Sequence, residues 1–127
     1  MKRLLLALLV SGCATVETPA PVSEPEAPPA AAHPPSENIA VAGLMDTARA
    51  DVAANRLGSA AATLERALRI EPRNPRLWHE LALVRLKQGD YAQAESTAQR
   101  SNAWAGADSD LRSANQRIIE EARTARR

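Results

Sequence analysis

The stretch that decides the fold covers residues 74–101, NPRLWHELALVRLKQGDYAQAESTAQRS, and is typical of two antiparallel helices joined by a tight turn. Asn74 supplies an N-cap, and Pro75 suits the first helical position because its missing N–H would have no intrahelical partner there. Gly89 suits a left-handed cap after the first helix, and Asp90 can cap the second. Apolar residues at helical spacing complete the pattern: Leu77, Trp78, Leu81, Val84 and Leu86, then Tyr91, Ala94 and Ala98.

The same pattern occurs once before, shifted by 34 residues, so that Asn55 aligns with Gly89 and Leu57 with Tyr91. A two-helix unit with this period resembles the tetratricopeptide repeat, whose signature is W-x2-L-G-x2-Y, then A-x3-F, then P. The residues that match are Trp78, Leu81, Ala82, Tyr91 and Ala94 in the second copy, and Ala60, Leu64, Ala67 and Pro72 in the first. Asp51 and Arg85 depart from the signature because they stand where its tyrosine is usual, and the smaller substitutions Thr47 and Ala98 imply a thinner core.

The resemblance implies an all-α fold, a short helical array over residues 38–127 with repeats at about 41–74 and 75–108. The expected helices cover 38–54, 57–70, 75–88, 90–103 and 109–125. The last of these has one polar face and fits the capping helix that closes such an array. Alanines allow neighbouring helices to approach closely, at positions 48, 60, 82 and 94. Trp104 has two interpretations, a core position beneath the capping helix, which is favoured, or an exposed interface anchor.

Residues 1–12 have the pattern of a signal peptide, with Lys2 and Arg3 before a short apolar run. The run ends in Ser11-Gly12-Cys13, which resembles the bacterial lipobox, so the resemblance implies that a diacylglycerol is attached to the Cys13 thiol. Several acyl chains would hold the protein durably to a membrane. Ala14 differs from the aspartate of an inner-membrane retention signal, which favours the periplasmic face of the outer membrane over the inner membrane. The alternative is an ordinary secreted protein with an incidental cysteine.

Residues 13–37 contain the lipid-bearing cysteine and a linker rich in Pro, Ala and Glu, which we expect to be disordered. Seven of the nine prolines lie here, and residues 14–38 carry four acidic side chains without a Lys or Arg. Proline favours extended polyproline II at about 3.1 Å per residue, so the linker could hold the helical domain well away from a membrane. A proline-rich ligand for a groove-binding domain is the alternative interpretation.

The sequence offers little for catalysis, metal or cofactor binding, and we expect no enzymatic activity. His79-Glu80 begins an H-E-x-x-H pattern, but Leu83 stands where the second histidine of that zinc motif would be. Cys13 is the only cysteine, and no glycine-rich phosphate loop occurs. From Ile39 onward there are 14 basic and 11 acidic residues, a difference of +3, which is too mild to indicate a nucleic-acid partner.

Binding of another protein is therefore the favoured function. In the repeat family that this chain resembles, the first helix of each pair lines a concave groove, which suits a peptide with acidic and apolar side chains. The repeat register places eight residues in that groove: Met45, Arg49, Val52, Arg76, His79, Leu83, Leu86 and Lys87. Met45 and Arg49 replace residues of the family's carboxylate clamp, so no such clamp is expected. Alternatively, Arg49 and Arg76 are simply solvated, or paired with Asp51 or Glu80.

Two functional hypotheses remain open. The first is a lipid-anchored periplasmic adaptor that holds a protein partner of an envelope assembly, namely pilus assembly, outer-membrane insertion or peptidoglycan synthesis. The second is a structural role through self-association. A short array leaves apolar surface uncovered, since such arrays usually need about three repeats, and two copies could pair through the first helix. A homodimer is therefore a possible state.

Overall fold

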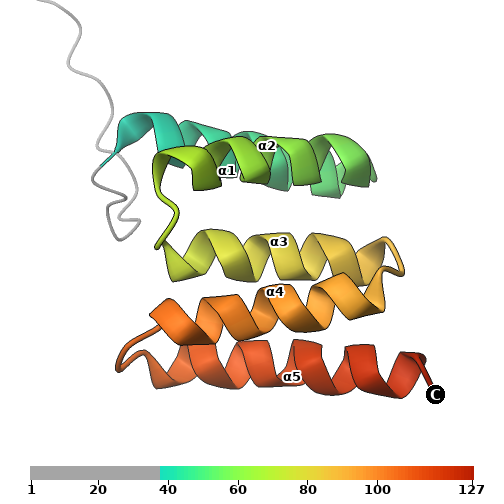
Figure 1. Ribbon diagram of the computed structural model, residues 1–127. Helices are drawn as coiled ribbons and strands as arrows, with labels where there is room; N and C mark the ends of the chain where they lie inside the picture. Colours follow the sequence, from blue (N-terminus) through green and yellow to red (C-terminus); the bar gives the residue numbers. More distant parts are fainter. Residues whose placement is uncertain (1–37) are drawn as a thin grey trace, which may run out of the picture. The chain divides into compact units, whose positions relative to one another are not determined.

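A computed structural model describes residues 38–127, which form five α-helices and no strand. The helices are α1 (Ile39–Ala53), α2 (Leu57–Ile70), α3 (Pro75–Lys87), α4 (Tyr91–Trp104) and α5 (Ser109–Ala125). Figure 1 shows them side by side in antiparallel succession, from α1 and α2 through α3 to α4 and α5. The all-α prediction is confirmed, and none of the helices in this part of the chain combines the length and hydropathy needed to cross a bilayer.

The helix boundaries follow from capping residues. Asn38 caps α1 by accepting from the Ala40 amide, and Asn74 caps α3 by accepting from Arg76 and Leu77. Asp90 and Asp108 cap α4 and α5 in the same way, each through the amide three residues later. The expected starts at residues 38 and 90 are therefore one residue early, because those residues are caps and lie outside the helix.

The repeat register is visible in the backbone of the turns. Gly89, between α3 and α4, has a φ of 79°, and Asn55, 34 residues earlier and between α1 and α2, has a φ of 57°. Glycine adopts this left-handed conformation without a Cβ clash, and asparagine is one of the few other residues that tolerate it. The two helix pairs therefore turn by the same local conformation, as the alignment of Asn55 with Gly89 predicts.

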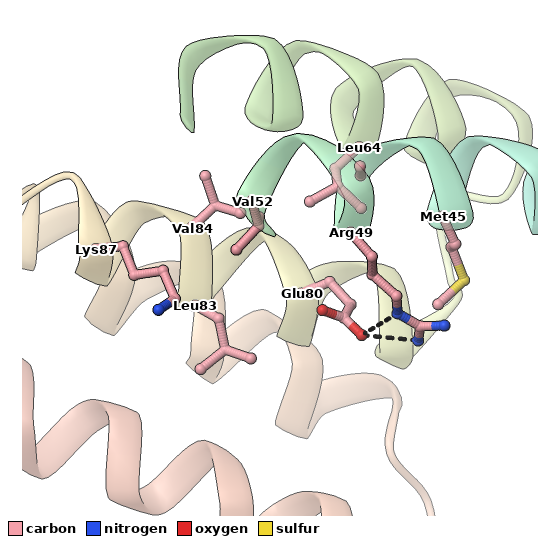
Figure 2. A pocket seen from close by; sticks show the side chains of 9 residues that line it. Met45, Arg49, Val52, Leu64, Glu80, Leu83, Val84 and Lys87 are labelled. Carbon is pink, nitrogen blue, oxygen red and sulfur yellow. Dashed lines mark hydrogen bonds and ion pairs between the residues drawn. The ribbon is translucent and has the colours of Figure 1, made fainter. Parts of the chain in front are cut away.

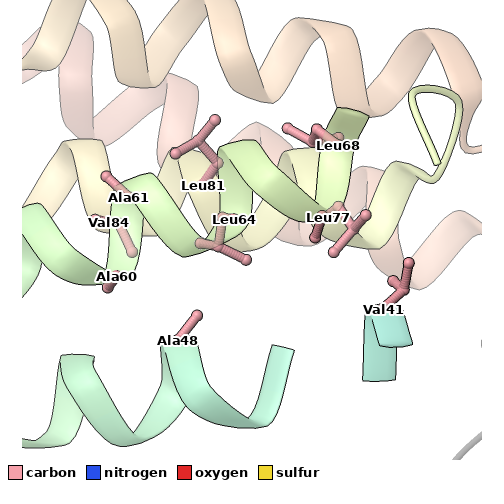
Figure 3. Packing of buried hydrophobic residues seen from close by; sticks show 10 residues of the cluster. Val41, Ala48, Ala60, Ala61, Leu64, Leu68, Leu77, Leu81 and Val84 are labelled. Carbon is pink, nitrogen blue, oxygen red and sulfur yellow. The ribbon is translucent and has the colours of Figure 1, made fainter. Parts of the chain in front are cut away.

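The core lies where the helix pairs stack, and alanine makes the contact close. Alanines 48, 60, 82 and 94 are all at most 2% exposed. Figure 3 shows Ala48 of α1 turned toward Leu64 and Ala60 of α2, and Val41 of α1 near Leu77 of α3. A second cluster joins α3 and α4 to α5 through Ala82, Ala94, Ala98, Ile118, Ile119 and Ala122. The capping helix packs against both α4 and α3.

Trp104 is a correction to the sequence analysis. Its side chain is 46% exposed, so it is not a core residue beneath α5. The guanidinium of Arg73 lies over its ring, 5.3 Å from the ring centroid. Ile70, which precedes Trp104 by 34 residues, is also 46% exposed. This register position at the end of the second helix is therefore outside the core in both repeats.

Candidate functional site: a pocket between the first helices of the two repeats

A pocket of about 110 Å³ lies between α1 and α3, with α2 behind it. Figure 2 shows its side chains converging from the two helices. Nine residues line it: Met45, Ala48, Arg49 and Val52 of α1, Leu64 of α2, and Glu80, Leu83, Val84 and Lys87 of α3. The wall is predominantly apolar, and its three charged residues are two cations and one anion. Such a surface suits a partner that inserts an apolar side chain and presents a carboxylate nearby.

An ion pair spans the pocket between the two helices. Arg49 donates to Glu80 Oε1 from Nη2 at 2.9 Å and from Nε at 3.2 Å. Its Nη1 also lies 3.8 Å from Asp46 of α1. The arginine is thus paired with Glu80, one of the two partners that the sequence analysis considered. Because Glu80 already balances this guanidinium, Arg49 mainly ties α1 to α3 and orders one end of the pocket.

Lys87 lies in the last turn of α3, away from the Arg49–Glu80 pair (Figure 2). It is exposed, and no carboxylate lies within ion-pair distance of its ammonium in residues 38–127. Leu83 stands one turn before it on the same helix face. The pocket rim therefore offers a partner both the positive charge of Lys87 and the apolar side chain of Leu83.

The structure brings five of the eight predicted groove residues into this pocket and places three elsewhere. The five are Met45, Arg49, Val52, Leu83 and Lys87. Arg76 instead lies 3.6 Å from Asp108, the cap of α5, and so does not pair with Asp51 or Glu80. His79 bonds to α5, and Leu86 packs against the cluster between α3, α4 and α5. The three residues that miss the pocket therefore lie on the sides of α3 that contact other helices.

A buried polar network joins α3, α4 and α5, and the sequence analysis did not identify it. Asn115 is fully buried and donates from Nδ2 to Ser101 Oγ at 2.7 Å and to Asn102 Oδ1 at 2.8 Å. Ser101 donates in turn to the carbonyl of Pro75 at 2.7 Å. His79 Nδ1 lies 2.7 Å from Asn115 Oδ1. Since an amide oxygen only accepts, Nδ1 of His79 donates the proton in this bond.

Charged pairs replace the tyrosine that the repeat signature has at Asp51 and Arg85. The Asp51 carboxylate is buried and accepts from Ser59 Oγ at 2.7 Å and from Arg56 Nη2 at 2.6 Å. These bonds, first that of Ser59 and then that of Arg56, lower the pKa of Asp51 below its ordinary value of 3.8. Arg85 donates to Glu65 at 2.6 Å. Hydrogen bonds therefore link α1 to α2 and α2 to α3 where an aromatic ring usually packs.

Residues 38–127 contain no grouping of three or more His, Cys, Asp or Glu side chains that could hold a metal ion. The signal peptide, the lipid on Cys13 and the linker of residues 13–37 lie outside the described residues. Those predictions stay predictions from the sequence.

Comparison with known proteins agrees with the helical register. A family model described as the tetratricopeptide repeat matches residues 51–118. The solved structure of the globular C-terminal domain of LpoP from P. aeruginosa is 40% identical, with a TM-score of 0.69, over 70% of this chain and 84% of that one. The comparison with curated proteins found no match. Because the family model covers more than half of the sequence and the helices repeat in its register, the chain belongs to the tetratricopeptide repeat family.

Proposed function

We propose that this protein is a lipid-anchored adaptor of the bacterial envelope, which holds a protein partner in the pocket between α1 and α3. The observation that carries the proposal is the pocket itself, an apolar wall with Lys87 at its rim, a cation that pairs with no carboxylate of residues 38–127. The partner would present an extended or helical segment with an apolar side chain for Val52 and Leu83, and a carboxylate for Lys87. The protein acts by binding, and catalysis has no part in the proposal.

The family and the similarity to a domain of LpoP support a protein-interaction role in general. The lipobox-like Ser11-Gly12-Cys13 supports the anchor and, with Ala14 after it, the periplasmic face of the outer membrane. The assembly in question, whether of pili, of outer-membrane proteins or of peptidoglycan, is to be identified through the partner.

The experiment is crosslinking in native membranes followed by capture of the full chain, with wild type beside Lys87→Glu. Arg112→Glu is the control, since it exchanges a cation for an anion at an exposed residue of α5 outside the pocket. We expect Lys87→Glu to lose the captured partner and Arg112→Glu to retain it. A partner that survives Lys87→Glu, or that both variants lose equally, contradicts binding in this pocket.

A domain exchange tests whether the partner is shared with the similar protein. Residues 38–127 would replace the globular C-terminal domain of LpoP in P. aeruginosa, and the crosslinked partners of the chimera would be compared with those of LpoP. Recovery of the same partner supports a common envelope assembly. Loss of that partner by a chimera that is present at normal levels contradicts it.

Self-association remains the alternative, and the described surface gives it little support. The large apolar side chains that are exposed in residues 38–127 are Ile39, Ile70 and Trp104, at the ends of three different helices. Ile39 alone of these belongs to α1, the helix without a predecessor. Measurement of the mass of the delipidated chain in solution separates the hypotheses, because a tight dimer favours the structural role and a monomer the adaptor.

A further inference from the structure

A second groove lies on another side of the array, between α2 and α4, with α3 as its floor. Its volume is about 540 Å³, and the residues that line it are Glu65, Leu68, Arg69, Pro72, Trp78, Leu81, Arg85, Gln93, Ser96, Thr97 and Arg100. On α3 it uses Trp78, Leu81 and Arg85, whereas the first pocket uses Glu80, Leu83, Val84 and Lys87. At 3.6 residues per turn these two sets point roughly 140° apart, so the grooves are separate surfaces.

The charge of this groove is positive. Arg69, Arg85 and Arg100 line it against a single carboxylate, that of Glu65, which Arg85 already holds at 2.6 Å. Neither Arg69 nor Arg100 forms an ion pair with any residue of the described chain. The groove therefore has two guanidinium groups that no carboxylate of residues 38–127 neutralises.

One arginine of the groove is held against a tryptophan ring that also lines it. The guanidinium of Arg100 lies over the ring of Trp78, 5.1 Å from the ring centroid. The Trp78 ring is itself fixed, because its Nε1 donates to the carbonyl of Pro72 at 2.8 Å. A guanidinium stacked by its face keeps the N–H groups of its edge available, and those groups match a carboxylate in two parallel bonds.

Two leucines give the groove an apolar lining. Leu68 of α2 and Leu81 of α3 are 7% and 5% exposed and line it together with polar residues of α2 and α4. The helical part of the α2 wall, from Glu65 to Arg69, is about 6 Å long at the rise of a helix, which spans roughly two residues of an extended peptide. An extended chain whose carboxylates alternate with small apolar side chains fits both the walls and the floor.

We propose that the groove between α2 and α4 is a second docking surface, which binds an extended acidic segment of a protein partner through Arg69 and Arg100, the latter held over the ring of Trp78. Charge complementarity selects this occupant, because the groove supplies two guanidinium groups that pair with no carboxylate of residues 38–127, and a single carboxylate that Arg85 already holds. The surface is independent of the pocket between α1 and α3, so an adaptor with both would hold two segments at once.

The chain carries its own fluorescent reporter for this proposal, because Trp78, one of its two tryptophans, lines the groove. Tryptophan fluorescence of the full chain would be measured during titration with a peptide of repeated Glu-Ala, and with the Gln-Ala peptide of the same length. We expect a saturable change with the Glu-Ala peptide alone. In the double variant Arg69→Glu/Arg100→Glu, the apparent affinity should fall by about tenfold or more.

Two controls separate this site from general charge attraction and from a membrane surface. Arg112→Glu/Arg117→Glu makes the same charge change at exposed residues of α5 outside the groove, and it should leave the titration unchanged. Equal binding of the Gln-Ala peptide, equal loss in the α5 variant, or no response to the Glu-Ala peptide overturns the proposal. A larger response to phosphatidylglycerol vesicles than to the peptide also overturns it, in favour of a lipid surface.

Discussion

Replacing Asn115 by alanine should lower the free energy of unfolding of the domain substantially, because this one side chain forms several buried hydrogen bonds. The variant removes three hydrogen bonds, those to Ser101, Asn102 and His79, each between 2.7 and 2.8 Å. At about 1 kcal/mol for each, and with the fully buried Ser101 left without one partner, the cost is about 2–3 kcal/mol. His79 and Asn102 are only half-buried, so in the variant their polar atoms can form hydrogen bonds to water. The free-energy cost is therefore smaller than if both were left buried without a partner.

The assay is urea unfolding of the full chain, followed by far-ultraviolet circular dichroism. A loss of this size is a large part of the roughly 5–15 kcal/mol that stabilises a domain, and it would lower Tm by roughly 10–20 °C in a domain of this length. Gln116→Ala is the matched control, because the neighbouring Gln116 is exposed and bonds only to Glu120 at 3.1 Å. It should change the free energy of unfolding by less than about 0.5 kcal/mol.

A second variant separates the hydrogen bonds from packing. Asn115→Leu fills a similar volume but offers no donor or acceptor, so it should also be destabilised because Ser101 stays buried with an unmet bond. The reasoning is refuted if Asn115→Ala unfolds at the same urea concentration as Gln116→Ala. It is also refuted if Asn115→Leu is as stable as wild type, since α5 would then be held by apolar contact alone.

Three further predictions concern the turns, the buried carboxylate and the core. Gly89→Ala should cost about 1–2 kcal/mol because φ is 79°, whereas Gly43→Ala inside α1 should stabilise by about 0.5–1 kcal/mol; urea unfolding measures both. The pKa of Asp51 lies below 3.8, so its stabilising effect relative to Asp51→Asn should be constant well above pH 3.8 and be lost as the pH falls through the folded-state value, which acid titration of stability tests. Leu77→Ala, at a fully buried site, should cost about 2–5 kcal/mol in the same unfolding assay, and a loss below 1 kcal/mol would contradict its place in the core.

Helix positions could be predicted from the sequence because their signals are local. A cap such as Asn74 before Pro75 acts through amides two or three residues away, and so its effect depends little on the rest of the fold. The turns at Asn55 and Gly89 are equally local, and their common backbone conformation agrees with the 34-residue register found in the sequence. The predicted helix ends, which depend on residues close by in the sequence, therefore agree with the structure to within one residue.

Residues whose environment depends on three helices could not be predicted in this way. Asn115 lies one turn after Leu111 on the buried face of α5. A prediction of the buried face from apolar residues alone does not include an asparagine. Its burial depends on partners in α3 and α4, 36 and 14 residues away in sequence for His79 and Ser101. The favoured core position of Trp104 was wrong, because its ring is 46% exposed and lies beneath the guanidinium of Arg73 at the surface.

The predicted groove residues of α3 do not all meet the same neighbouring helix. Glu80 and Leu83 line the pocket against α1, and Leu83 also packs against the cluster between α3, α4 and α5, while Arg76 and His79 meet α5 and its cap. The capping helix therefore does more than cover an end, since it contacts α3 as well as α4. A partner in the pocket between α1 and α3 would meet Lys87 and Leu83, and charge changes at Arg76 should affect the seating of α5 before they affect binding.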